Sequence, residues 1–295
     1  MHRRASKATI PPMSLAEVFA PAPSAPRQML ERARGVARIG FVADGDTTRL
    51  AENFQSGSAK ARFPKPRVGQ PPEVVLLNTA GGVTGGDHLT YAVSIGSRAR
   101  AVATTQAAER IYRRNEGTAH IDSTLDVAEG ASLDWLPQET ILFDRSALRR
   151  TLTADVHPTG RLLAVESIVL GRTAMGETIR DATLADNWRI RRGGKLVFAD
   201  GLRLTGDSVA ILAGGATGGG AIALATLVLV APDAEASVDV ARAALTDAAS
   251  EAGASAWNGM LVARLTARSG HVLRADLTRL IEALRQATMP GTWRC

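Results

Sequence analysis

The chain has 295 residues, 45% of them hydrophobic and 22% charged, and a formal net charge of +6. This composition is typical of a water-soluble globular protein, and the length is sufficient for one large domain or two small ones. The single cysteine, Cys295, excludes a disulfide framework, and the longest apolar stretch, residues 221–231, is too short to cross a membrane. Because no apolar run of signal-peptide length follows Arg3 and Arg4, we expect a cytoplasmic protein.

The basic charge is carried mainly by arginine, since only four of the 35 Lys and Arg residues are lysine. Arginine binds carboxylates and phosphates, which would suit an anionic partner, but a genome biased toward arginine and alanine is the simpler explanation. Aromatic residues make up 4% of the chain and are not interleaved with a basic stripe. The sequence therefore gives little support to nucleic-acid binding.

The first part of the chain differs in composition from the rest. Residues 1–33 show little hydrophobic periodicity, and they contain five prolines: Pro11, Pro12, Pro21, Pro23 and Pro26. Such a segment is predicted to be a flexible, partly extended arm. Residues 34–295 are predicted to form a single β-rich domain.

Short strands dominate the pattern that follows. Residues 74–77 are a short apolar run, and apolar residues alternate with polar ones over residues 89–95, 125–127, 133–135 and 152–156. A period of two places each apolar set on one face of a half-buried strand. In this pattern Trp135 shares a face with Leu133, so its indole is predicted to be buried.

A hairpin and two late helices complete the predicted elements. Gly193 and Gly194 separate two apolar-alternating segments, as the positive φ angles of a tight hairpin require. Residues 237–250 carry an apolar helical stripe, with Ser237 as the predicted N-cap. A second stripe runs from Leu273 to about residue 287 before Pro290, with a further strand at residues 259–267 between the two helices. The sequence predicts a mainly β protein with two C-terminal helices.

Residues 78–87 (NTAGGVTGGD) hold four glycines within six positions. A phosphate-binding loop is one interpretation, but no Gly-Lys-Ser/Thr follows and the segment leads into a strand. A buried structural turn, in which Asp87 accepts hydrogen bonds from backbone N–H groups, is favoured. A second glycine tract, residues 214–220, is predicted to be a loop.

Acidic residues recur beside the predicted strands. They are Glu109, Glu139, Asp144, Glu166 and Glu177. Paired carboxylates would suit acid–base catalysis as in glycoside hydrolysis, or they would offer oxygen ligands to a divalent ion in transit, or they would simply pair with arginines. The five histidines are scattered, and no familiar catalytic motif is present, so neither a tight soft-ligand metal site nor a known catalytic constellation is expected.

A set of segments follows the glycine-rich loop in a fixed order. They are residues 104–113 (TTQAAERIYR), 133–144 (LDWLPQETILFD), 166–172 (ESIVLGR) with 175–177 (MGE), and 188–190 (WRI) before the hairpin. Together with the loop, these segments resemble the UreD (UreH) family of urease accessory proteins. The order and spacing match from about residue 35 to residue 293. Two positions depart from the family pattern: Asn78-Thr79-Ala80 stand where prolines are usual, and Gly291 stands where the C-terminal motif usually has arginine.

The resemblance implies an elongated, β-helix-like or stacked-sheet fold with two C-terminal helices. It also implies a non-enzymatic scaffold or chaperone that acts with UreF and the GTPase UreG on apo-urease to incorporate nickel. No tightly bound cofactor is implied, and nickel would pass only transiently, through an internal water-filled passage. If nickel passes, the residues expected to line its path are Asp87, Glu139, Asp144, Glu166 and Glu177. A carbohydrate-active hydrolase and a basic nucleic-acid-binding module remain as alternatives.

Overall fold

The computed structural model describes residues 31–67, 69–172 and 176–294. The predicted flexible arm over residues 1–33 lies almost wholly outside this part of the chain. The arm and the domain boundary after it therefore remain predictions. No helix within the described residues combines the length and the apolar character needed to span a bilayer.

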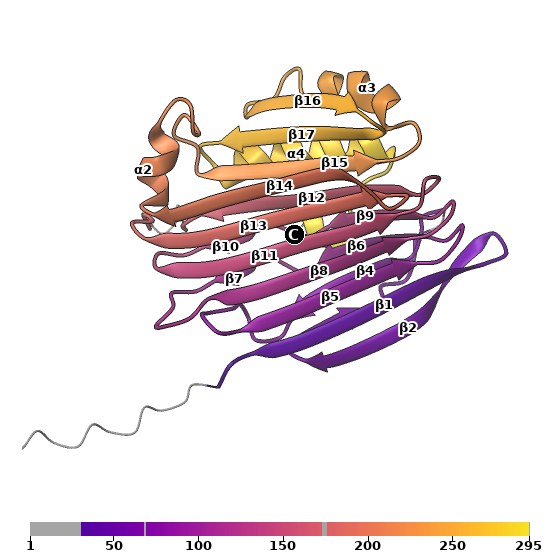
Figure 1. The fold of residues 1–295 in the computed structure, drawn as a ribbon, viewed down its shortest axis with the longest axis horizontal. Coiled ribbons are helices and arrows are strands. Elements are labelled where there is room, and N and C mark those ends of the chain that lie inside the picture. Colours follow the sequence, from indigo (N-terminus) through magenta and orange to yellow (C-terminus); the bar gives the residue numbers. More distant parts are fainter. Residues whose placement is uncertain (1–30, 68, 173–175, 295) are drawn as a thin grey trace, which may run out of the picture. The chain divides into compact units, whose positions relative to one another are not determined.

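The strands form two sheets (Figure 1). Sheet A has the order β14 (Lys195–Gly206), β13 (Ala182–Arg192), β11 (Ser146–Val156), β8 (Ala119–Val127), β5 (His88–Ile95), β1 (Arg34–Asp44) and β2 (Thr47–Gly57). Sheet B has the order β16 (Glu251–Trp257), β17 (Met260–Ala267), β15 (Ala223–Val230), β12 (Arg161–Leu170), β9 (Ser132–Leu136), β6 (Arg100–Thr105), β4 (Glu73–Asn78) and β3 (Ala59–Arg62). Two short strands, β7 (Glu109–Ile111) and β10 (Thr140–Leu142), lie beside sheet B's main path.

The chain alternates between the two sheets through its central part. It runs from β4 in sheet B to β5 in sheet A, back to β6, and so on through β8, β9, β11 and β12 to β13. Successive strands of the same sheet pair in parallel, so every two crossings add one rung to a β-helix-like stack. The predicted mainly β, stacked-sheet architecture is confirmed.

Two apolar cores explain which strands are buried on which faces. The first core fills the space between the sheets and takes alternate residues from their strands. The second core lies between the outer face of sheet B and the helices α3 (Val238–Ala244) and α4 (Gly270–Arg285). Strand β12 contributes to both cores, which is why its sequence is an almost unbroken apolar run. Trp135 belongs to the first core with Leu133, and the predicted burial of its indole is confirmed.

The helices agree only in part with the sequence prediction. Helix α4 is confirmed and ends at Arg285, where Gln286 adopts a left-handed φ of 53°. The helix predicted for residues 237–250 was too long, because α3 ends at Ala244. Ser237 occupies the predicted N-cap position, but its side chain makes no capping hydrogen bond. The short helix α2 (Ser208–Ala213) and the 3₁₀ helices η2 (Ala234–Ser237) and η3 (Gly291–Arg294) were not predicted.

The predicted turns are confirmed. Gly193 and Gly194 have φ angles of 55° and 78° and join β13 to β14 in an antiparallel hairpin. Residues 214–220 form the predicted loop between α2 and β15.

The sequence did not predict the edge strands β2 and β16, because neither strand buries a regular apolar face.

Candidate functional site

The glycine-rich segment is a turn packed tightly against the neighbouring rung. An added Cβ on Gly82 would lie 2.3 Å from the Tyr112 ring, and one on Gly85 would lie 2.1 Å from the Glu116 carbonyl oxygen. Both positions therefore require glycine for close approach of the chain. Asp87 is buried in this turn, where its carboxylate accepts hydrogen bonds from backbone N–H groups.

The two carboxylate oxygens of Asp87 have separate donors. Oδ1 accepts from the backbone N–H of Ala33 and Oδ2 from that of Thr84, each at 2.8 Å. The geometry agrees with the structural interpretation of this turn. Through these two hydrogen bonds, Asp87 joins the residue before β1 to the glycine-rich turn.

Asp144 and Glu177 meet at the edge where the chain passes from sheet B to sheet A. The Asp144 N–H donates to Glu177 Oε1 at 3.2 Å. Asp144 Oδ1 accepts from the N–H groups of Arg180 and Asp181 at 2.8 and 3.0 Å. Glu177 Oε2 accepts from the N–H and Nε of Arg172 at 3.1 and 3.0 Å. Internal donors therefore satisfy both carboxylates.

The same donors set the ionisation of the pair. Burial acts to raise both pKa values, but the N–H groups of Asp181 and Arg180 outweigh it at Asp144, and the guanidinium of Arg172 does so at Glu177. Each pKa therefore lies below its ordinary value, and both groups stay ionised at neutral pH.

Beside this pair lies an open hollow of about 560 Å³ with three arginines around it. It is lined by Tyr112, Arg113, Phe143, Asp144, Arg145, Arg172 and Glu177. The Tyr112 and Phe143 rings meet edge to face with centroids 5.1 Å apart. The Arg172 guanidinium lies 4.4 Å from the Phe143 ring centroid. Three guanidinium groups against two satisfied carboxylates favour an anion in this hollow over a divalent cation.

Glu139 lies where two of the family-like segments meet the end of the chain. Arg274 of α4 forms an ion pair with Glu139 at 2.6 Å and donates to Gln138 Oε1 at 3.1 Å. The Gln138 amide donates to the carbonyl oxygens of Gln106 and Thr292, at 2.8 and 3.1 Å. Gln106 lies in the gap between β6 and β7, and Gln138 and Glu139 lie in the gap between β9 and β10. The hydrogen bond from Gln138 to Thr292 holds the C-terminal 3₁₀ helix η3 against these two gaps in sheet B.

Glu166 is buried to the same extent as Asp87, with 5% of each residue exposed. It pairs with Arg150, which also binds Asp186 through two hydrogen bonds of 3.1 and 2.7 Å. The indole of Trp135 donates to Glu166 Oε1 at 3.3 Å. Burial raises the pKa of Glu166 to about 7, against the lowering effect of the Arg150 guanidinium. This ion cluster joins the inner faces of the two sheets.

Glu109 has a perturbed pKa but was absent from the predicted ligand set. It is half-buried beside a hollow of about 220 Å³, and it accepts a hydrogen bond from the Asn78 amide at 3.1 Å. Burial raises its pKa to about 7. The place of Glu109 in the family-like segment 104–113 was the sequence signal that could have identified it. Its burial could not be predicted in this way, because it depends on residues of the neighbouring rung.

The parallel register brings together two histidines that are far apart in sequence. His88 and His120 pair across β5 and β8, with ring centroids 5.7 Å apart. His88 Nε2 lies 2.7 Å from Asp122 Oδ2. Among the described residues, however, no group of three or more His, Cys, Asp or Glu side chains has an arrangement that could hold a metal ion.

The candidate carboxylates therefore do not form one cluster. Among the five, a direct hydrogen bond within the described residues joins only Asp144 and Glu177. Asp87, Glu139 and Glu166 are engaged with different partners. A continuous polar passage lined by all five remains a prediction.

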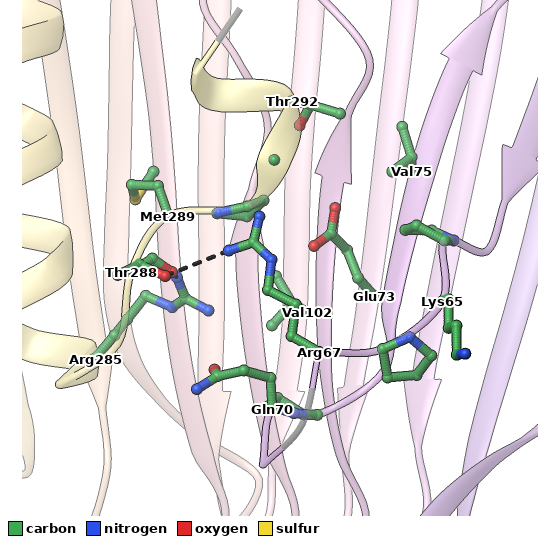
Figure 2. Close-up of a pocket in the computed structure, with 15 residues that line it drawn as sticks. Lys65, Arg67, Gln70, Glu73, Val75, Val102, Arg285, Thr288, Met289 and Thr292 are labelled. Carbon is green, nitrogen blue, oxygen red and sulfur yellow. Dashed lines mark hydrogen bonds between the residues drawn. The ribbon is translucent and has the colours of Figure 1, made fainter.

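Figure 2 shows the residues that line another hollow, between residues 64–67 and 70–75 on one side and residues 285–292 on the other. Its volume is about 330 Å³. Arg67 and Arg285 project into it, and Arg67 Nη1 lies 3.4 Å from Thr288 Oγ1. Burial raises the pKa of Glu73 in the same hollow, while the two guanidinium groups oppose that shift. With a single carboxylate, this hollow lacks the set of oxygen ligands that a divalent cation needs.

Comparison with known proteins assigns nearly all of the described residues to one family. The family model described as "UreD urease accessory protein" matches residues 33–294. The chain is 46% identical to a urease accessory protein UreD of Xanthobacter autotrophicus over 267 residues, covering 90% of this chain and 92% of that protein. It is 45% identical to the UreD of Azorhizobium caulinodans over 270 residues, covering 91% and 98%. It is 46% identical to a UreD 2 of Methylorubrum populi over 281 residues, covering 95% and 94%.

Proposed function

Because the chain belongs to the UreD urease accessory protein family, we propose that it is a non-enzymatic scaffold required for nickel incorporation into apo-urease. It acts in the cytoplasm, in a complex with UreF and the GTPase UreG. The observation that carries this proposal is the family match over residues 33–294, which includes both sheets and the C-terminal helices. Family membership itself gives the coarser role of a urease accessory protein.

The chemistry of the described carboxylates supports a scaffold that holds no metal tightly. A structural or catalytic nickel site would need several deprotonated ligands directed at one point. Glu139, Glu166 and Glu177 are instead each paired with an arginine. Nickel is therefore cargo in this proposal, and no resident cofactor is proposed.

The same contacts disfavour the hydrolase alternative. A glycosidase needs two carboxyl groups facing each other across a cleft that admits the sugar. Glu166 and Asp186 are close to each other but are buried between the sheets on a shared Arg150. Asp144 and Glu177 accept internal hydrogen bonds and lie beside arginines.

Co-expression tests the proposal. Urease structural proteins are produced with UreF and UreG, with and without this chain, and the purified urease is analysed for nickel and activity. We expect the nickel content and the activity to fall at least tenfold without the chain, and the chain to co-purify with UreF and urease. Equal nickel loading in its absence would contradict the proposal.

Charge-neutral substitution tests whether nickel passes along the predicted carboxylates. The variants are Asp87→Asn, Glu139→Gln, Asp144→Asn, Glu166→Gln and Glu177→Gln. A role in conduction predicts an intact complex with less nickel in urease, because an amide oxygen binds a divalent ion more weakly than a carboxylate. Asp155→Asn, on the exposed face of β11, is the matched control.

The outcomes of this series separate conduction from folding. Loss of protein or complex in a variant would assign a structural role to that carboxylate, as the Asp87 and Glu166 contacts suggest. Nickel loading that is unchanged in all five variants would reject these residues as a path.

A further inference from the structure

Arg145 has an unusual backbone conformation for an exposed arginine. Its φ is 59°, in the left-handed region that favours glycine. The conformation is held from two sides, because the Arg114 N–H donates to the Arg145 carbonyl at 3.0 Å and the Arg145 N–H donates to the backbone carbonyl of Asp181 at 2.5 Å. Glycine or asparagine would satisfy the same turn with less strain. The two backbone hydrogen bonds therefore fix the position from which the Arg145 side chain projects.

The side chain of Arg145 is available for binding. It is 65% exposed, and its ion pair with Asp144 is long, at 3.9 Å. Asp144 is itself occupied by backbone N–H groups of the next turn. The guanidinium of Arg145 therefore lacks a close carboxylate partner.

Arg113 provides a second available cation in the same hollow. Within the part of the chain that the structure describes, its guanidinium forms no hydrogen bond or ion pair, whereas Arg172 is fixed by Glu177 and by the Phe143 ring. Tyr112, 37% exposed, adds an aromatic surface beside these charges. The hollow thus presents two exposed guanidinium groups, of which Arg145 has only a long ion pair and Arg113 has no ion pair within the described residues.

The surroundings select among anionic partners. Asp144, Glu177 and Asp181 stand among the arginines, so the positive charge is interrupted and does not form the continuous basic stripe that follows a nucleic-acid backbone. Separate side-chain carboxylates can instead each meet one arginine fork. We propose that the hollow at Arg113 and Arg145 docks an acidic, Asp- or Glu-bearing segment of a protein partner. The inference rests on the proposed function in one respect: a scaffold protein is expected to have a protein partner.

Substitution of Arg145 by glycine separates binding from folding. The probe is a fluorescently labelled octa-glutamate peptide, titrated by anisotropy against the full chain at low salt. We expect Arg145→Gly to weaken binding at least fivefold while the melting temperature is unchanged or raised, since glycine relieves the left-handed strain. Arg113→Gln should weaken binding by a similar factor.

Arg98 offers a matched control. It is also exposed, has a φ of 60°, and lies in the turn between β5 and β6, at the opposite ends of the sheet A strands. Arg98→Gly should relieve similar strain and leave peptide binding unchanged. Octa-glutamine should not bind to any variant.

Three outcomes would overturn the inference. Equal loss of binding in Arg98→Gly would mean non-specific attraction, and a lower melting temperature for Arg145→Gly with unchanged binding would mean a purely structural arginine. Tighter binding of an oligothymidylate of eight nucleotides than of octa-glutamate would assign the hollow to phosphates. Nickel loading of urease is measured in a separate experiment. If urease is loaded equally well without this chain, the proposed function is contradicted, but the result of the peptide titration still stands.

Discussion

Replacing Arg150 by methionine is expected to lower the free energy of unfolding by about 3–5 kcal/mol at pH 8. The substitution removes the only guanidinium that the structure places against Glu166 and Asp186 among the described residues, and leaves both carboxylates buried between the sheets. Denaturant unfolding of the full chain measures the loss. Arg149→Met, on the exposed face of the same strand, is the control and should change stability by no more than about 0.5 kcal/mol.

The loss from Arg150→Met should depend on pH in a defined direction. Without the guanidinium the two carboxyl groups can escape an unpaired charge only by binding protons, so the loss should be smaller at pH 5 than at pH 8. In the unsubstituted chain, burial already raises the pKa of Glu166 to about 7. Because the folded state binds this proton more tightly than the unfolded state, protonation of Glu166 stabilises the fold. This stabilisation is fully present below the unfolded pKa of Glu166, near 4.5, and is lost as the pH rises through about 7. A loss below about 1 kcal/mol at pH 8 would show that the cluster rearranges or takes in water.

Trp135→Ala is expected to cost about 3–5 kcal/mol, because it empties a large volume in the core between the sheets. The same change also removes the N–H donor of Glu166. Trp257→Ala is the matched control: this indole, in edge strand β16, is 43% exposed, so its removal should have a much smaller effect.

Trp135→Phe distinguishes the two parts of the Trp135 effect. Phenylalanine keeps most of the buried volume but cannot donate to Glu166, and we expect a cost of about 1–3 kcal/mol. A cost equal to that of Trp135→Ala would assign the whole effect to the lost hydrogen bond. No cost at all would mean that Glu166 needs only Arg150.

These stability effects determine how the proposed nickel-loading test has to be interpreted. A variant such as Glu166→Gln that lowers nickel loading is informative only if its unfolding free energy is retained. Glu166 is the candidate for which folding and nickel transfer are hardest to separate, because it belongs to the ion cluster between the sheets. Glu139 and Glu177 are partly exposed and paired near the surface, so their neutral variants give the cleaner test.

Local pattern was sufficient for the repetitive part of the fold. Strict alternation in β5 and β11, the paired glycines between β13 and β14, and the apolar stripe of α4 each reflect constraints within one element. The helix predicted for residues 237–250 was wrong beyond Ala244 because tertiary contacts prevailed there. Asp276 accepts from the Ser250 N–H at 2.7 Å, and the residues that follow pair with β17 as β16.

By itself, the sequence determined the fold class, the strand faces that are buried, and, through its ordered motifs, the family. The partners of the charged residues were decided only by the tertiary structure. Arg150 meets Glu166 and Asp186, 16 and 36 positions away, because the strands stack in register. Arg274 meets Glu139, 135 positions away, because α4 packs on sheet B. Such contacts depend on how strands and helices pack together, and a side chain's period within its own element does not specify them.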